Sequence, residues 1–263
     1  MTSSKAQARL FVEADLCSAA TVPISAKQAH YLGTVLRMRA GATIAIFNGR
    51  DGEWLARIEA LGKADATLSV LERRHPQAPE PDLWLAFAPI KRAPIDFLAQ
   101  KATELGASRL WPVFTRNTQV KRINLARLRA NAIEAAEQSG RLGVPEVVEP
   151  VSLENLIATW PRGRRLLVPD ETGGGQPLAD VLAPATDIDV TPGPFAILTG
   201  PEGGFARSEL DALRKLSSVT FVGLGPRILR ADTAALSALA CWQALIGDWR
   251  DPPPREPKFG IDN

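Results

Sequence analysis

The chain has 263 residues, of which 45% are hydrophobic and 23% charged, a composition typical of a globular protein with a sizeable buried core. It has no apolar run long enough for a membrane helix and no apolar core of a secretory signal near the N-terminus, so we expect a cytoplasmic protein. Two cysteines and two histidines are too few for a disulfide framework and make a poor metal-binding set, and we expect no metal.

Charge is distributed unevenly along the chain. Residues 1–145 carry 20 Lys+Arg against 13 Asp+Glu, whereas residues 146–263 carry 11 against 16. A basic first half favours an anionic partner such as nucleic acid. Ordinary solvated surface is the other interpretation that charge alone allows.

Residues 1–75 have the pattern of a small β-rich domain. Short apolar or alternating runs begin at Arg9, and the turn Asn48–Gly52 is typical of a hairpin between two of them. A helix is expected from Ser25, its N-cap, to Met38. Arg37 and Arg39 then lie at its C-terminal end, where they either contact phosphate or only complement the helix dipole.

A proline-rich linker is predicted at residues 76–82, because three prolines within seven residues from His75 to Pro81 make an extended, stiff segment. We expect a second domain over residues 83–250. Residues 251–263 begin with Asp251 and three prolines and are predicted to be a disordered tail.

Strands and helices alternate in the second domain, which predicts a mainly parallel α/β fold. Its unbroken apolar runs are typical of strands that are covered on both faces. Asn124 and Ser152 are expected to cap two of the helices. The glycine-containing loop Asp170–Gly175 suggests only flexibility. The expected strands are residues 83–88, 109–114, 165–168, 195–198 and 219–223.

Two glycine turns follow the last two strands, and such turns at strand ends commonly hold a small ligand. The first, Thr199–Gly204, lacks the Gly-Lys-Ser/Thr of a P-loop and the Ser of a nucleophile elbow, and its spacing is wrong for a dinucleotide fingerprint. A plain strand-to-helix turn stays open. The second, Leu224–Arg230, offers backbone amides and an apolar slot for a flat ring such as adenine.

Several blocks of the chain resemble one known family, the ribosomal RNA small subunit methyltransferase E family. The resemblance runs from about Arg9 to Trp249. The blocks are Gly200–Phe205, Leu224–Arg230, Gln100–Gly106 and Glu137–Arg141, together with His30–Leu32 and Val35–Arg37 in the front domain.

The resemblance implies a SPOUT-type α/β domain with a C-terminal trefoil knot and an N-terminal PUA-like β-barrel for RNA. It implies a homodimer that binds S-adenosylmethionine and methylates N3 of one uridine in the 16S ribosomal RNA of the small subunit. By position, the cofactor pocket comprises Leu198, Gly200, Glu202, Gly203, Leu224, Gly225, Ile228, Leu229 and Arg230.

Three positions depart from the family pattern. Arg92-Ala93-Pro94 replaces a common Gly-Asp-Arg, and Ala206 replaces a common Ser, so that Ser208 is expected to cap the next helix. Asp232 stands where Glu is usual, and we expect it to be the N-cap of the last helix.

Arg230 is the candidate catalytic residue, where it would stabilise the uracil anion, and a structural ion pair with Asp232 or Glu202 is the alternative. No general base is identifiable from the sequence.

RNA contacts are expected from six cations: Arg9, Arg37, Arg39, Lys91, Arg92 and Arg116. Two other functions are weighed against methyl transfer. A non-catalytic RNA-binding protein of ribosome assembly fits the basic half but not the glycine turns. A nucleotide hydrolase lacks the phosphate-binding lysine and the metal carboxylates in the turns.

Overall fold

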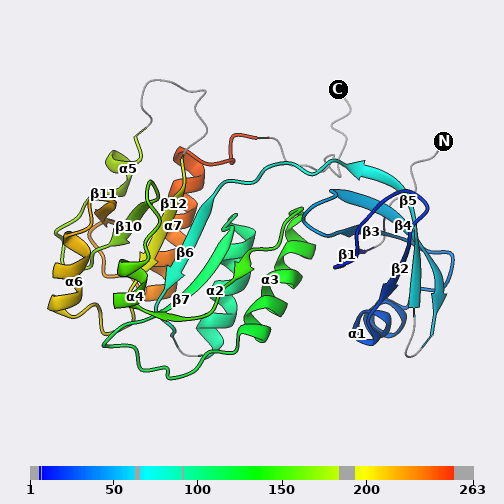
Figure 1. The fold of residues 1–263 in the computed structure, drawn as a ribbon, viewed down its shortest axis with the longest axis horizontal. Coiled ribbons are helices and arrows are strands. Elements are labelled where there is room, and N and C mark those ends of the chain that lie inside the picture. Colours follow the sequence, from blue (N-terminus) through cyan, green and yellow to red (C-terminus); the bar gives the residue numbers. More distant parts are fainter. Residues whose placement is uncertain (1–5, 7, 63–65, 91, 184–192, 252–263) are drawn as a thin grey trace. The chain divides into compact units, whose positions relative to one another are not determined.

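The computed structural model describes residues 6, 8–62, 66–90, 92–183 and 193–251, and the side chains of residues 92 and 93 are left aside. The chain forms two compact units (Figure 1). The first comprises Met1–Pro79 with Ala136–Val144, and the second comprises Glu80–Ala135 with Pro145–Asn263. The predicted domain boundaries stay predictions, and the predicted tail lies, from residue 252 on, outside the described residues.

The first unit contains a five-stranded sheet, counted over the described residues, with the order β1-β3-β4-β5-β2. β1 and β3 are parallel and the other pairs are antiparallel. The turn between β3 and β4 confirms the predicted hairpin. The elements of this unit are β1 (Arg9–Phe11), β2 (Thr21–Ile24), α1 (Ala26–His30), a π-helix η1 (Tyr31–Val35), β3 (Thr43–Phe47), β4 (Glu53–Leu61) and β5 (Ala66–His75).

The helix predicted over residues 25–38 is confirmed at its start and differs at its end. Ser25 is the N-cap of α1, with a capping box closed by Gln28. From Tyr31 the backbone widens to π geometry, in which the N–H of Leu36 donates to the carbonyl of Tyr31 at 3.0 Å. Arg37 then adopts a left-handed conformation, φ 55°, that ends the helix.

The second unit is built on a sheet whose described strands all pair in parallel, in the order β11-β13-β10-β12-β6-β7-β8 with β9 beside β7. The expected strands are confirmed. They are β6 (Leu83–Phe87), β7 (Arg109–Phe114), β8 (Glu146–Val147), β9 (Val151–Ser152), β10 (Arg165–Pro169), β11 (Gln176–Pro177), β12 (Phe195–Thr199) and β13 (Val219–Gly223).

Helices cover both faces of this sheet, which explains the unbroken apolar strands. Ala196 and Leu198 of β12 pack in one core with α4 and α6, whereas Phe195 stacks edge-on against Trp242 of α7 on the other face, with ring centroids 5.7 Å apart. The helices are α2 (Arg92–Glu104), α3 (Leu125–Ser139), α4 (Leu153–Ala158), α5 (Leu178–Val181), α6 (Arg207–Arg214) and α7 (Ala231–Leu245). The trefoil knot stays a prediction.

Of the four caps predicted in the second unit, two are confirmed and two are wrong. Asn124 and Ser152 accept the expected N–H bonds from Arg127 and Asn155. The α6 cap is not Ser208: the buried carboxylate of Glu209 accepts the N–H of Ala206, the N-cap residue, at 2.7 Å. The α7 N-cap is Arg230 rather than Asp232, whose carboxylate instead accepts the N–H of Thr233.

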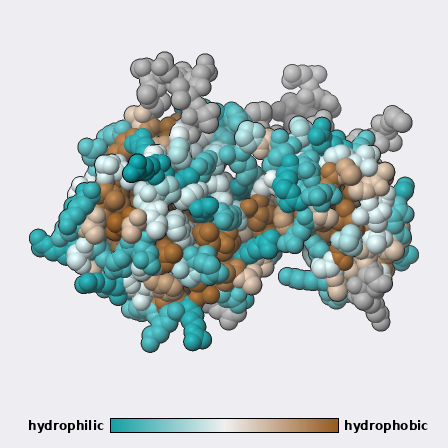
Figure 2. All heavy atoms as spheres, viewed as in Figure 1, coloured by the Kyte–Doolittle hydropathy of each residue, from teal (hydrophilic) through white to brown (hydrophobic). Residues whose placement is uncertain are grey.

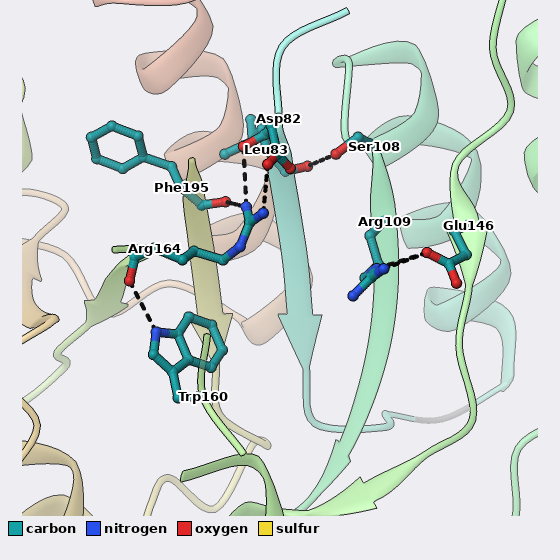
Figure 3. Close-up of polar contacts among 8 residues, drawn as sticks. All are labelled: Asp82, Leu83, Ser108, Arg109, Glu146, Trp160, Arg164 and Phe195. Carbon is teal, nitrogen blue, oxygen red and sulfur yellow. Dashed lines mark hydrogen bonds and ion pairs between the residues drawn. The ribbon is translucent and has the colours of Figure 1, made fainter. Parts of the chain in front are cut away.

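An arginine is buried at the amino ends of the central strands (Figure 3). Arg164 pairs with Asp82 at 2.5 Å, donates to the carbonyl of Phe195 at 2.9 Å, and stacks 3.5 Å from the centre of the Trp84 ring. Arg109 stacks on the same ring at 3.8 Å and pairs with Glu146. These contacts join β6, β7, β10 and β12 at the end of the sheet where those strands begin.

Apolar and hydrophilic side chains are interspersed on the face shown in Figure 2. Among the described residues, the large apolar side chains that stay exposed are Val35, Leu36, Phe97, Ile228 and Trp249. No helix within the described ranges is both long and apolar enough to cross a membrane.

Candidate active site

Three loops leave the carboxyl ends of β10, β12 and β13 and enclose a cavity of about 670 Å³. β10 lies between the other two strands in the sheet, so the three loops emerge side by side. Ligands of open α/β sheets bind at this end of the strands. The volume is within the range of about 300–1,000 Å³ usual for small-molecule sites.

The loop after β12 makes a tight turn in which the N–H of Gly204 donates to the carbonyl of Pro201 at 2.9 Å. Gly204 has φ 65°, a conformation that favours glycine. Asn117 fixes the turn, because its side-chain amide donates to the carbonyls of Gly203 and Gly204, both at 3.0 Å. The turn therefore presents Glu202 from a backbone that is held in place.

The loop after β13 supplies an apolar wall and a cation. Ile228 lines the cavity and is 83% exposed, so it offers apolar surface to a ligand. Arg230 is exposed at the start of α7. Over the described residues, its guanidinium forms no ion pair with Glu202 or Asp232, so the alternative of a structural ion pair has no support in the geometry.

The third loop, residues 170–175, was expected only to be flexible, and it forms a wall of the same cavity. Asp170 organises it by accepting the backbone N–H and the hydroxyl of Thr172 at 2.9 and 2.7 Å. Gly175 lies so close to Val222 that a Cβ would come within 2.5 Å of its backbone. Asp170 and Glu171 add two carboxylates to the cavity. The position of this loop after a neighbouring parallel strand is the signal that could have identified it.

Most residues of the predicted cofactor pocket meet at this cavity. Leu198 is fully buried in the core and Gly203 lies in the turn but outside the lining. The lining residues are Gly200, Glu202, Leu224, Gly225, Ile228, Leu229 and Arg230. Their contact with a cofactor stays a prediction.

The six predicted RNA contacts differ in their surroundings. Arg37 and Arg39 are exposed on the first unit, and Arg116 is exposed on the second. Lys91 and the side chain of Arg92 lie outside the described residues. The guanidinium of Arg9 is committed to Glu53 at 2.5 Å, to the carbonyls of Ala136 and Arg141, and to the ring of Phe47. These contacts give Arg9 a structural role, and its contact with RNA stays a prediction.

Comparison with known proteins agrees with this fold. The RNA methyltransferase domain family matches residues 77–243, and the RNA methyltransferase PUA domain family matches residues 24–71. The fold and the cavity thus define an RNA methyltransferase.

Individual relatives narrow this class. The chain is 30% identical to ribosomal RNA small subunit methyltransferase E of Rickettsia conorii, covering 88% of this chain and 93% of the relative. It is 31% identical to the protein of the same name from Synechocystis sp., covering 90% and 78%. The crystal structure of the Neisseria gonorrhoeae protein bound to S-adenosyl methionine superimposes with a TM-score of 0.79 at 28% identity, covering 92% of this chain and 99% of that one. The chain belongs to the ribosomal RNA small subunit methyltransferase E family.

Proposed function

We propose that this protein transfers a methyl group from S-adenosylmethionine to N3 of one uridine in 16S ribosomal RNA, acting on the small ribosomal subunit as a cytoplasmic homodimer. The observation that carries the proposal is the cavity that three loops build at the carboxyl ends of β10, β12 and β13, in a chain of this family.

The residues of the cavity fit S-adenosylmethionine chemically. Leu224, Ile228 and Leu229 offer an apolar surface to an adenine ring, and the glycine turns bring backbone polar groups close to the ligand. Asp170 and Glu171 can accept hydrogen bonds from ribose hydroxyls or an ammonium group. When bound, S-adenosylmethionine supplies an electrophilic methyl group on a sulfonium.

In this proposal, Arg230 stabilises the negative charge that develops on the base. Uridine loses the N3 proton before or as N3 forms a bond, and the negative charge then spreads onto the two carbonyl oxygens of the ring. A guanidinium at the cavity wall with no ion-pair partner among the described residues is free to donate to such an oxygen. One donor of this kind contributes about 3 kcal/mol to transition-state stabilisation.

The proposal is tested by incubating the protein with tritiated S-adenosylmethionine and small subunits that lack the modification, followed by mapping of the labelled nucleoside. Label in N3-methyluridine at one position supports it, and label in any other nucleoside contradicts it. Calorimetric titration with S-adenosylmethionine separates an enzyme from a non-catalytic RNA-binding protein, which would give no binding heat.

Replacement of Arg230 by Ala should lower the rate of methyl transfer about 100-fold, the equivalent of one lost oxyanion donor. The affinity for S-adenosylmethionine should change less than about threefold, a small fraction of that energy. Arg230 caps α7 only through its backbone, so Ala preserves the helix start. Arg207→Ala, at an exposed position outside the cavity, is the control. Equal losses of rate and of affinity for S-adenosylmethionine would instead mean that Arg230 acts in binding the cofactor.

A further inference from the structure

A second cavity, of about 380 Å³, lies against the first and shares part of its wall. Glu202, Arg230 and Ala231 line both cavities. The other described residues that line the second are Ile90, which follows β6, Pro94 in the first turn of α2, and Asp232. A carboxylate and a guanidinium therefore stand at the boundary between the two spaces.

The backbone around Glu202 is held in place, and its exposed carboxylate is not engaged by any described residue. The turn that carries it is closed by the bond from Gly204 to Pro201 and fixed from outside by Asn117. Within the described part of the chain, the Glu202 side chain has no hydrogen-bond or ion-pair partner. By contrast, the carboxylate of Asp232 in the same cavity accepts the N–H of Thr233 at 2.8 Å.

The walls of the second cavity suit a flat, uncharged ring with a polar edge. Ile90, Pro94 and Ala231 offer apolar surface to the faces of a base, as in the pockets that enclose a flipped-out nucleotide. The polar edge of uracil carries an N–H donor between two carbonyl acceptors. Glu202 can accept from the donor and Arg230 can donate to an acceptor.

We propose that the second cavity receives the uracil ring and that Glu202 is the general base for the N3 proton. This inference rests on the proposed function. The N3–H bond breaks and its proton passes to the Glu202 carboxylate. The electron pair left on N3 forms the bond to the methyl carbon, while the pair of the broken carbon–sulfur bond stays on sulfur. The proton then leaves Glu202 for solvent.

Among the described residues, the charged groups that line the cavities with Glu202 come from three segments. Arg230 and Asp232 belong to the start of α7, Arg227 to the loop before it, and Asp170 and Glu171 to the loop after β10. Arg230 favours transfer because it stabilises the anion that forms on the ring. Glu202 thus takes the proton from N3, and Arg230, on the same wall, stabilises the anion that is left on the ring.

The first test is Glu202→Gln, which keeps the size of the side chain and removes its charge. Single-turnover methyl transfer to unmodified small subunits should fall by about 10²–10⁴-fold, the range for a lost general base. Because the variant depends on uracil that is already ionised, its rate should rise about tenfold per pH unit in the neutral range, more steeply than that of the wild type. Asp211→Asn, outside both cavities, should match the wild type.

The second test uses substrates reconstituted with 5-fluorouridine, in which the fluorine makes the N3 proton more acidic. The defect of Glu202→Gln should shrink at least tenfold on this substrate, whereas a residue that only shapes the cavity would give the same defect on both. An undiminished defect, a wild-type rate, or a loss of cofactor affinity as large as the loss of rate would overturn the assignment.

The third test needs no catalysis. Uridine 5′-monophosphate at millimolar concentration, added to the cofactor-free protein, should shift the methyl resonance of Ile90, which lines the second cavity. S-adenosylhomocysteine should shift that of Ile228, which lines the first. Absence of a shift at Ile90 would overturn the base pocket. Wild-type methyl transfer is measured in parallel. If the wild type itself transfers no methyl group to uridine N3, the proposed function fails, and this result is distinct from a failure of the base pocket.

Discussion

Arg37 has a backbone conformation that L-amino acids rarely adopt. Its φ of 55° ends the helical segment and lets the N–H of Met38 donate to the carbonyl of Leu32 at 2.9 Å. The side chain of Met38 is buried by this turn, and its neighbours Arg37 and Arg39 are exposed. At such a position glycine is the favoured residue, so an arginine here has a reason other than local stability.

Replacement of Arg37 by Gly should stabilise the first unit by up to about 1 kcal/mol, since it relieves the left-handed strain, whereas Arg37→Ala retains that strain. If Arg37 contacts phosphate, both variants should weaken RNA binding and reduce the slope of log affinity against log salt by about one. Thermal unfolding and binding at several salt concentrations measure the two effects. An unchanged salt slope in both variants would contradict the phosphate contact.

The sequence predicted side chains of the site that belong to recognisable local turns and missed those fixed by distant contacts. Glu202 and Arg230 were identified because the family resemblance implies a cofactor pocket on the two glycine turns that contain them. Glu209, which lies in α6, was not, because both of its partners are backbone groups: one is close in sequence, but the other, Arg116, is far away. Arg9 was expected at an RNA surface, since nothing in its local pattern shows that Glu53 and the segment Ala136–Val144 engage it.

At the scale of elements, α6 shows how a helix start is stabilised without an N-cap side chain. Ala206 offers no acceptor, and Glu209 accepts the N–H of Ala206 at 2.7 Å and that of Arg116 at 2.9 Å. Glu209 is 5% exposed, and its carboxylate joins the start of α6 to the loop after β7. An ionised carboxylate near a helix N-terminus is also favoured by the helix dipole.

Replacement of Glu209 by Gln should destabilise the second unit by about 1–3 kcal/mol, because the amide has a single acceptor oxygen and leaves one buried N–H without a partner. Ser208→Ala, at an exposed neighbouring position, should cost less than about 0.5 kcal/mol. Chemical denaturation followed by tryptophan fluorescence measures both. A larger cost for Ser208→Ala would restore Ser208 as the cap.

The longer strands of the second unit, β6, β7, β10, β12 and β13, were predictable because each is a mainly apolar run between turn residues. The very short strands β8, β9 and β11 were not, since two residues carry no periodicity and pair only because a neighbouring strand is there. The switch to π geometry after His30 was missed for a similar reason: an apolar helical pattern does not distinguish the two kinds of turn.

At the scale of the whole molecule, the buried Arg164 contacts and the candidate active site lie at opposite ends of the sheet in the second unit. The Arg164 contacts gather where the central strands begin (Figure 3), and both cavities lie where strands end. In contrast, the grouping of Ala136–Val144 with the first unit could not be predicted, because it depends on contacts such as that of Arg9 across more than a hundred residues.

Replacement of Arg164 by Met should destabilise the second unit by about 1–3 kcal/mol, since it leaves the carbonyl of Phe195 without its buried side-chain donor, whereas Asp82, 51% exposed, is solvated. Arg109→Met removes a cation from the same Trp84 ring, but its partner Glu146 is 58% exposed, so the loss should stay below about 1 kcal/mol. Denaturation measures the losses, and S-adenosylmethionine affinity under native conditions should be unchanged in both. A loss of affinity for S-adenosylmethionine in either variant would contradict the separation between the Arg164 contacts and the cavities.

Arg116 and Asn117 are adjacent in the chain and have different roles. The side chain of Asn117 donates hydrogen bonds to the turn that contains Glu202. The side chain of Arg116 is exposed, and its backbone N–H donates to the carboxylate of Glu209. If RNA binds Arg116, it restrains the neighbouring Asn117, which supports the turn that lines the first cavity. Thermodynamic reciprocity then requires that cofactor tighten RNA by the same factor as RNA tightens cofactor. Two adjacent residues would thus make the protein hold its two substrates most firmly when both are present.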